Sequence, residues 1–142
     1  MSKLKAVRYH DFCAGHRVVG HESKCANLHG HNYRVHFSCE AIDSELDEVG
    51  RVIDFSVIKE TVCEWLENNW DHRMLIWSDD PLKERLRLLD KTVVSVRFNP
   101  TAENMAEHLL TEVCPRLLQP LGIQVTKIQI DETRKCSVTC EA

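Results

Sequence analysis

The amino-acid sequence predicts an α+β fold, with an antiparallel four-stranded sheet and two long helices packed on one face of it. Segments in which apolar and polar residues alternate lie near both ends of the chain, as expected for strands of a half-buried sheet. Two segments between them carry apolar residues at helical spacing. The predicted strands and helices are grouped rather than strictly alternating, which favours an antiparallel sheet. The length predicts a single domain over residues 1–142.

Two strands are predicted near the start of the chain, over residues 4–16 and 30–42, and a closing hairpin over 123–131 and 135–142. The segment 17–28 is rich in Gly, Ser, Lys and Asn, so we expect a loop between the first two strands. The apolar residues that alternate in the second strand are Tyr33, Val35, Phe37 and Cys39.

Two long helices are predicted from their caps and their apolar stripes. Asp54 is a good N-cap for a helix that runs to about Asn69, and Thr101 is a good N-cap for the second. Pro115 and Pro120 are expected to end the second helix. Residues 70–80 interrupt the helical pattern. The segment that follows suggests a short helix over 81–90 and a short strand over 92–98.

Composition excludes several classes of protein. The net charge is −4, from 18 basic and 22 acidic residues, which argues against binding to nucleic acid or to a membrane surface. We find no apolar run of transmembrane length and no signal-peptide core, so we expect a cytoplasmic protein. Its seven cysteines should then be mostly free thiols. Among them, Cys136 and Cys140 share one face of the last predicted strand and are expected to be buried.

A small sheet of this kind has exposed edges, which proteins cover or pair. Strands from neighbouring subunits could remove these edges by closing a barrel. We therefore expect a homo-oligomer.

Three histidines form a candidate metal site. His29 and His31 are two residues apart on a predicted strand and therefore point to the same face, while Gly30 leaves the opposite face open. Two exposed strand histidines would be the plain interpretation of this pair. If the first two strands pair antiparallel, however, His16 comes close to both. Three histidines with an open fourth position are typical of catalytic zinc.

Cys25 precedes this pair in the segment CANLHGH and follows Lys24. A nearby cation and a metal would both favour its thiolate. Cys25 could be the fourth ligand of a structural zinc site, or a catalytic base or nucleophile. Structural sites usually carry paired ligands such as CxxC, which this sequence lacks, so the catalytic role is favoured.

Further polar groups could serve such a thiol. Asp71 and His72 directly follow the first long helix, where a carboxylate could orient an imidazole for proton transfer; a polar helix end is the plain alternative. Glu132 ends an apolar strand and would face any pocket there. Thr101 and Glu103 start the second helix, where a cap and a dipole-favouring acid are the plain interpretation.

Together these motifs resemble the 6-pyruvoyl-tetrahydropterin synthase superfamily, in the same order over most of the chain. The matching segments are FCAGH for its FxAxH zinc motif, CANLHGHNY for its cysteine-plus-HGH motif, VIDFSVIK for its helix entry, WDHRML for its LDHxxL segment, NPTAENMAEHL for its PTxEN helix start and IDET for its KET-type pterin anchor. The segment 77–98 is longer than in compact members and could reshape the mouth of the pocket.

The resemblance implies the tunnelling fold, in which trimers close a β-barrel and two trimers often form a homohexamer. Active sites in this family lie between subunits, so the catalytic residues need not meet within one chain. Three residues separate Cys25 from His29, a spacing similar to the branch that acts in 7-deazaguanine (queuosine) biosynthesis. That branch converts 7,8-dihydroneopterin triphosphate to 6-carboxy-5,6,7,8-tetrahydropterin, acetaldehyde and triphosphate. The pyruvoyl-forming branch stays an alternative, as does a non-enzymatic structural zinc module.

The resemblance also implies a role for each candidate residue. Zn²⁺ would be the cofactor, with the histidine trio as its ligands. Cys25 would remove a proton from the substrate side chain, and His72, oriented by Asp71, would shuttle protons. Glu132 would bind the pterin, with Thr101 and Glu103 lining the same pocket. The substrate's triphosphate needs cations, and the candidates near the site in sequence are Lys24, Arg73 and Arg134.

Overall fold

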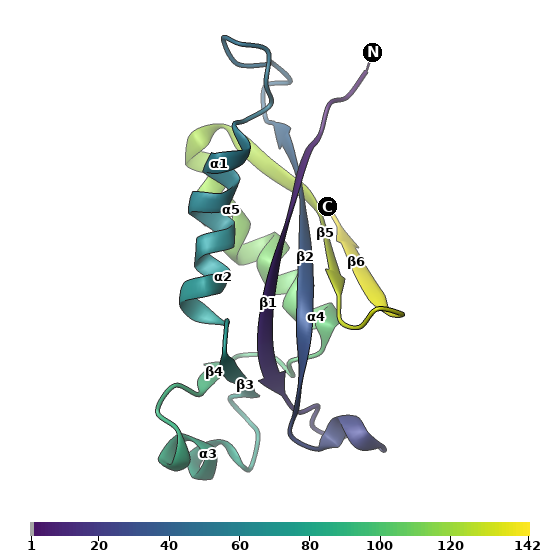
Figure 1. Ribbon diagram of the computed structural model, residues 1–142, viewed down its shortest axis with the longest axis vertical. Coiled ribbons are helices and arrows are strands. Elements are labelled where there is room, and N and C mark those ends of the chain that lie inside the picture. The colour runs from purple at the N-terminus through teal and green to yellow at the C-terminus, as the bar shows by residue number, and fades with distance from the viewer. Residues whose placement is uncertain (1) are drawn as a thin grey trace.

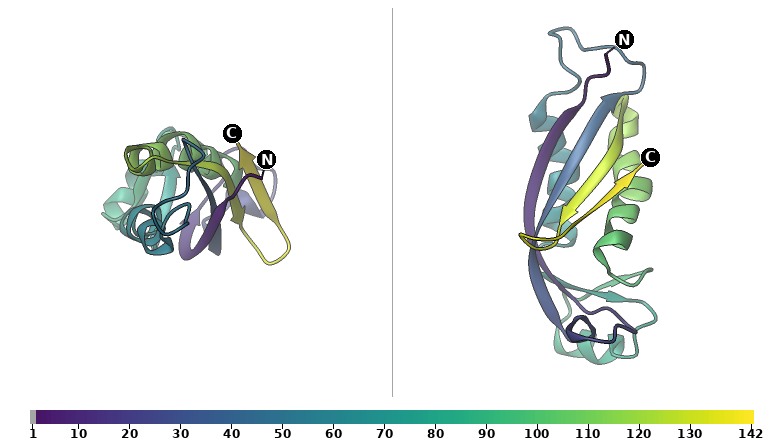
Figure 2. Two further views of the ribbon diagram at one scale, coloured as in Figure 1. Left: turned by 90° about the horizontal axis from the view of Figure 1, so that it is seen from above. Right: turned by 90° about the vertical axis from the view of Figure 1, so that its right-hand side faces the viewer.

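The structure is a computed structural model that describes residues 2–142. A single curved sheet is covered on one face by two long helices (Figures 1 and 2). The sheet has six strands in the order β4-β3-β1-β2-β5-β6. Four neighbouring strands pair antiparallel, in agreement with the predicted strands. They are β1 (Ala6–His16), β2 (His29–Ala41), β5 (Ile123–Asp131) and β6 (Ser137–Glu141).

The prediction of four strands, all antiparallel, is wrong because two short strands extend the sheet beyond β1. Strand β3 (Arg73–Trp77) pairs parallel with the last three residues of β1, and β4 (Val94–Val96) pairs parallel with β3. The sheet is therefore six-stranded and mixed. Residues 73–77 were expected only to interrupt the helical pattern. They form a strand because the chain leaves the first helix directly beside the open edge of β1.

The first long helix begins after Asp54, whose side chain accepts a hydrogen bond from the Ser56 backbone N–H, as predicted for an N-cap. It continues without interruption to Asn69. Its three consecutive parts are α1 (Phe55–Ile58), a wider π-helical turn η2 (Lys59–Cys63) and α2 (Glu64–Asn69).

Thr101 caps the second long helix by accepting a hydrogen bond from Asn104 N–H, again as predicted. Its parts are α4 (Ala102–His108), the π-helical turn η3 (Leu109–Val113) and α5 (Cys114–Leu118), followed by a 3₁₀ turn η4 (Gln119–Leu121). Pro115 does not end this helix, contrary to the prediction. It occupies the first turn of α5, after the π-helical turn, and the helix ends just before Pro120.

The core lies between the sheet and these helices. The four alternating residues of β2, Tyr33 to Cys39, are all at most 1% exposed, as their alternation predicted. They pack with apolar side chains of both helices in one hydrophobic cluster. The helix residues at its centre include Ile58, Leu66, Met105 and Leu109. The opposite face of the sheet carries the polar side chains of β1 and β2.

Residues 78–93 connect β3 to β4 at one end of the molecule (Figure 1) and include the predicted short helix, α3 (Lys83–Leu89). This segment is anchored by Asp80, whose side chain is fully buried and accepts a 2.7 Å hydrogen bond from Arg17 Nε. At the other edge, Cys136 is exposed and precedes β6, and Cys140 is only partly buried. The prediction that both thiols are buried is therefore wrong. Among the described residues, no helix is long and apolar enough to cross a membrane.

Candidate metal centre and active site

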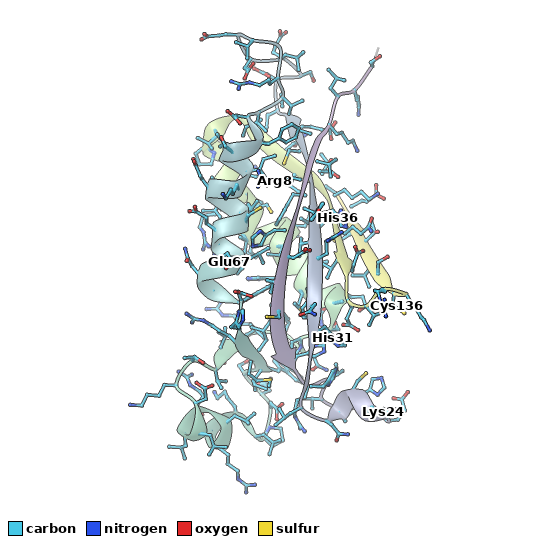
Figure 3. The ribbon with its side chains drawn as sticks, in the orientation of Figure 1. Arg8, Lys24, His31, His36, Glu67 and Cys136 are labelled. Atoms are coloured by element: carbon cyan, nitrogen blue, oxygen red, sulfur yellow. The ribbon has the colours of Figure 1, made fainter. Side chains whose placement is uncertain are left out.

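The structure brings His16, His29 and His31 together. His16 ends β1 and pairs directly with His29, which begins β2, and His31 follows on the same face two residues later. Each offers a ring nitrogen, and these three atoms lie within 4.8 Å of one another. His31 lies near the sheet end that also carries the β5–β6 turn and the short 3₁₀ turn η1 (Lys24–Ala26) (Figure 3).

Backbone carbonyls fix the protonation of two of these rings. Nδ1 of His16 lies 2.6 Å from the Pro100 carbonyl oxygen, and Nδ1 of His29 lies 2.7 Å from the Asn27 carbonyl oxygen. A carbonyl only accepts, so both Nδ1 atoms donate and, in the neutral rings, both Nε2 atoms carry lone pairs. These two Nε2 atoms are nevertheless only 3.0 Å apart. In metal sites, a ligating histidine almost always donates its other ring N–H to a carbonyl or a carboxylate, as His16 and His29 do here.

The third ring adds a buried nitrogen without a partner. His31 Nε2 has no hydrogen-bond partner, and the nearest carboxylate oxygen, Glu132 Oε1, is 3.9 Å away. Burial lowers the pKa of His16 to about 4, and burial also lowers the pKa of His31, so both rings are neutral near pH 7. Neutral imidazoles are what zinc binds, and two of them on a tetrahedral zinc ion place their nitrogens about 3.3 Å apart. The trio fits Zn²⁺.

Cys25 is partly buried in η1 and does not belong to this group of metal-ligating atoms. Its loop is fixed at several points. Cys25 C=O accepts a 2.8 Å hydrogen bond from Val18 N–H, and the next carbonyl, of Ala26, accepts one from Arg17 Nη1 at 3.1 Å. Asn99 exchanges two side-chain hydrogen bonds with the backbone of Val19. In the part of the chain that the structure describes, the Cys25 thiol is not among the ligand atoms grouped with the three histidines.

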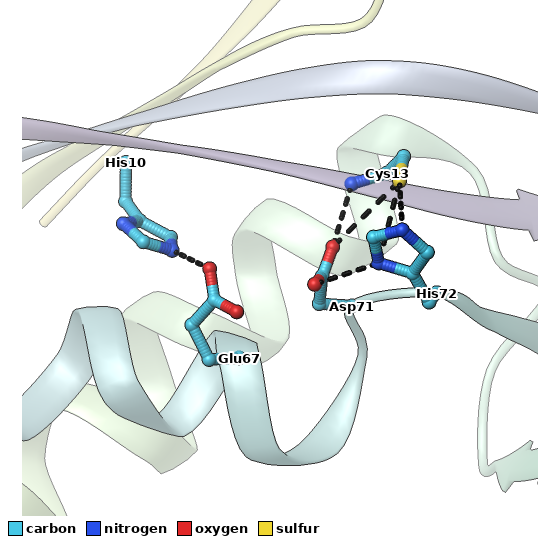
Figure 4. Close-up of polar contacts among 5 residues, drawn as sticks. All are labelled: His10, Cys13, Glu67, Asp71 and His72. Carbon is cyan, nitrogen blue, oxygen red and sulfur yellow. Dashed lines mark hydrogen bonds and ion pairs between the residues drawn. The ribbon is translucent and has the colours of Figure 1, made fainter.

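Asp71 and His72 do interact, but within one chain they meet a different thiol. His72 Nδ1 donates to Asp71 Oδ2 at 2.8 Å, and both side chains lie next to Cys13 in β1 (Figure 4). Burial opposes ionisation of Asp71. Hydrogen bonds from Cys13 N–H and His72 outweigh this effect and lower the pKa of Asp71, so it is a carboxylate near neutral pH. His72 has a left-handed backbone (φ 60°), and its N–H donates to Cys13 C=O at 2.6 Å.

Cys13 was not singled out from the sequence. It lies 58 residues before Asp71, and only the parallel pairing of β1 with β3 brings the two together. The sole signal in the sequence was its position three residues before His16, within FCAGH.

The remaining predicted residues divide into two groups. Glu132 follows β5 and reaches the histidine trio, as its contact with His31 shows. Thr101 and Glu103 lie at the start of α4, next to Pro100, whose carbonyl holds His16. The Thr101 hydroxyl caps the helix, and Glu103 is exposed in its first turn, so both have the plain roles expected of them.

A cavity of about 1040 Å³ is lined by residues of β1, β2, the end of α2 and the β5–β6 turn. Cys13, Asp71 and His72 line one part of it. Its basic lining residues are Arg34, Arg134 and Lys135. Of the predicted cations only Arg134 is among them. The sequence reasoning missed Arg34 and Lys135, which reach the cavity from β2 and from the β5–β6 turn.

Known proteins resemble this chain over nearly its whole length. A family model described as 6-pyruvoyl tetrahydropterin synthase matches residues 5–142. A protein of Rickettsia typhi named 6-carboxy-5,6,7,8-tetrahydropterin synthase is 38% identical over 137 residues, covering 95% of this chain and 98% of the relative. One of Haemophilus influenzae with the same name is 29% identical over 141 residues, covering 92% and 93%.

Solved structures show the same fold. A crystal structure of an uncharacterized protein from Wolinella succinogenes superposes with a TM-score of 0.84 at 28% identity, covering 99% of both chains. The 6-pyruvoyl tetrahydropterin synthase of Caenorhabditis elegans gives a TM-score of 0.64 at 25% identity, covering 100% of this chain and 97% of that one. Together with the match over residues 5–142, these relationships show that the chain is an enzyme of the 6-pyruvoyl tetrahydropterin synthase family.

Proposed function

We propose that this enzyme converts 7,8-dihydroneopterin triphosphate to 6-carboxy-5,6,7,8-tetrahydropterin, acetaldehyde and triphosphate, in the pathway to queuosine. The observation that carries the proposal is the convergence of three histidine ring nitrogens, with the Glu132 carboxylate 3.9 Å from one of them. The C-x-x-x-H-G-H spacing and the names of the relatives support the carboxy-forming branch.

His16, His29 and His31 would hold Zn²⁺. The ion would act as a Lewis acid that lowers the pKa of the substrate's side-chain hydroxyls. The carbonyls of Pro100 and Asn27 keep two of these rings in the tautomer that this requires.

Glu132 would orient the pterin. Its carboxylate only accepts hydrogen bonds, which suits the amino and ring N–H groups of a pterin. Its position 3.9 Å from His31 would place the pterin side chain next to the histidine trio. Thr101 and Glu103 would contribute to the pocket only from its outer wall, since the Thr101 hydroxyl is occupied as a helix cap.

Cys25 would remove a proton from the substrate side chain, and His72 would carry protons while the Asp71 carboxylate stabilises its charged form. Within one chain, His72 lies beside Cys13 instead of Cys25. We therefore propose that Cys25 of one subunit acts with Asp71 and His72 of a neighbour. A barrel of trimers paired into a homohexamer would supply this arrangement and would pair the edge strands β4 and β6.

The substrate's triphosphate would bind the cations that line the cavity, Arg34, Arg134 and Lys135. A single domain over residues 1–142 and a cytoplasmic location stay predictions.

The identity of the reaction product distinguishes the carboxy-forming branch from the pyruvoyl-forming branch. Zinc-loaded protein would be incubated with 7,8-dihydroneopterin triphosphate and the mixture analysed by mass spectrometry, with acetaldehyde trapped. A carboxypterin together with acetaldehyde supports the proposal. A pyruvoyl product without acetaldehyde assigns the chain to the activity named for the Caenorhabditis elegans structure.

The Cys25→Ala variant distinguishes a catalytic role of Cys25 from a role as the fourth ligand of a structural zinc site. If Cys25 is catalytic, the variant keeps its zinc and its fold but loses turnover by at least about 100-fold. If Cys25 is the fourth ligand, the variant binds zinc poorly and loses stability on purification. Cys140→Ala, which alters a partly buried thiol outside the cavity lining, is the matched control and should change neither property.

A further inference from the structure

A second trio of metal-ligating groups lies outside the histidine centre. Cys13, Asp71 and His72 each offer one ligand atom, and these atoms all lie within 4.8 Å of one another. We propose that they form a second metal site, which takes a zinc-like divalent cation such as Zn²⁺ or Cd²⁺. Thiolate, imidazole and carboxylate are the three side-chain ligands that zinc accepts.

The distances agree with one ion bound by all three groups. Cys13 Sγ lies 3.6 Å from His72 Nδ1 and 3.8 Å from Asp71 Oδ1, and His72 Nδ1 lies 2.8 Å from Asp71 Oδ2. A sulfur and a nitrogen on the same tetrahedral zinc ion are about 3.5 Å apart, given bonds of about 2.3 and 2.0 Å. Sulfur to carboxylate oxygen is about the same, so only a small movement of Asp71 is needed.

The ligating nitrogen of His72 is Nδ1, which lies beside both the thiol and the Asp71 carboxylate. An ion there takes the place of the proton that Nδ1 donates to Asp71 Oδ2, and Nε2 of the exposed ring then carries the N–H and donates it to water. The other oxygen, Asp71 Oδ1, accepts from Cys13 N–H at 3.0 Å and stays on the thiol side.

The site is open to solvent and held by the backbone. The His72 side chain is 78% exposed, so an ion has a direct path of entry and its fourth position is free for water. The left-handed backbone of His72 is locked by its hydrogen bond to Cys13 C=O. Cys13 occupies a position that the FxAxH motif leaves open, so the second site is a property of this chain beyond the family motif.

The consequence for turnover rests on the proposed function. An ion bound by Asp71 and His72 displaces the proton between them, so the pair can no longer exchange protons with the substrate. Zinc in excess of the histidine centre would therefore inhibit the enzyme through Cys13.

Metal stoichiometry tests the site without any assay of activity. Protein equilibrated with excess Zn²⁺ and then desalted should hold two ions per chain, measured by mass spectrometry of the element. Cys13→Ser should hold one. Cys136→Ser is the matched control, because its thiol lines the same cavity outside the trio, and it should hold two. One ion in the unaltered chain, or two in Cys13→Ser, would overturn the proposal.

Cadmium reports on the thiolate directly, because a cadmium–sulfur bond adds an ultraviolet charge-transfer band that histidine ligands do not give. The band should appear in the unaltered chain and in Cys25→Ser, and should be absent from Cys13→Ser. Its loss only in Cys25→Ser would place the sulfur ligand in the histidine centre and refute the second site. His72→Gln, at an exposed side chain, repeats the stoichiometry test should Cys13→Ser fold poorly, and one ion is expected.

Inhibition is measured last. Zinc beyond the first equivalent should reduce turnover of the unaltered chain to less than about a tenth, as expected when general acid–base catalysis is lost. Cys13→Ser should resist this inhibition, measured as the ratio of its own turnover with and without excess zinc. Equal inhibition of both would refute the regulatory role. If no dihydropterin is turned over at all, the proposed function fails while the stoichiometry still decides the metal site.

Discussion

His16 and His29 face each other with their Nε2 atoms 3.0 Å apart. The Nδ1–H of His16 donates to the Pro100 carbonyl, and the Nδ1–H of His29 donates to the Asn27 carbonyl. In the neutral rings, two lone pairs at this distance repel, and a cation bound by both removes the repulsion. The geometry of these two residues therefore suits a metal ion.

Replacing His29 by Ala should abolish zinc binding. Its loss removes one of three ligands, so affinity should fall by more than about 100-fold, since changes in the outer hydrogen bonds alone already cost 10–100-fold. Zinc per chain after dialysis measures this effect. His36→Ala is the control, because His36 lies on the same strand but bonds Asp131 at 2.9 Å. Equal zinc content in the two variants would contradict the assignment of the ligands.

Gly30→Ala should weaken both the fold and the metal centre. A Cβ at Gly30 would lie 3.0 Å from the Ala14 carbonyl oxygen on the paired strand, so β1 and β2 would have to separate beside His16 and His29. Overpacking of this kind costs about 1–3 kcal/mol, measurable by urea denaturation, and zinc affinity should fall with it.

Gly122→Ala is the matched control for that experiment. Gly122 has φ +76° and open space around it, so alanine there costs about 1 kcal/mol through backbone strain alone. It lies after η4, away from the histidines, and zinc affinity should not change. An equal loss of zinc affinity in both variants would mean that general destabilisation explains the effect.

Structural features that depend on neighbouring residues were predicted correctly from the sequence, whereas features that depend on long-range contacts were not. The caps Asp54 and Thr101 and the alternation in β2 depend on neighbours a few residues away, and the structure contains all of them. Strand β3 was missed because five residues after a helix carry no period of their own and become a strand only by pairing with β1. The same pairing brings Cys13 to His72, so that cluster could not be read from the spacing of its members.

The buried pair of Arg17 and Asp80 should contribute more to stability than an exposed pair of similar geometry. The Asp80 side chain is fully buried, and Arg17 also holds the Ala26 carbonyl in the Cys25 loop. Asp80→Ala leaves Arg17 without its partner, which should lower the free energy of unfolding by about 3 kcal/mol. It should also speed alkylation of Cys25, followed by peptide mass spectrometry.

Asp11→Ala is the control for this comparison. Asp11 pairs with Arg34 through two hydrogen bonds of 2.7 and 3.0 Å, but both side chains are about half exposed. Breaking that pair should cost less than about 1 kcal/mol and leave the alkylation of Cys25 unchanged. Similar losses in the two variants would show that burial of Asp80 adds nothing.

The buried thiols predict that the protein loses stability in alkaline solution. Burial raises the pKa of Cys39 to about 12 and of Cys63 to about 11, from an ordinary value of 9.0. Above pH 9 the unfolded chain releases these protons while the folded chain keeps them, so unfolding becomes more favourable as pH rises. The stabilisation is complete below about pH 9 and is lost towards the folded pKa values.

Between about pH 8.5 and pH 10.5, each of these two thiols should lower the free energy of unfolding by roughly 1–2 kcal/mol, measured by urea denaturation at each pH. Cys63→Ala removes one ionisable group, so its stability should depend less steeply on pH than that of the unaltered chain. Cys136→Ala changes an exposed thiol and should leave the pH dependence unaltered. If Cys63→Ala and the unaltered chain lose stability in parallel, the burial of Cys63 does not govern alkaline unfolding.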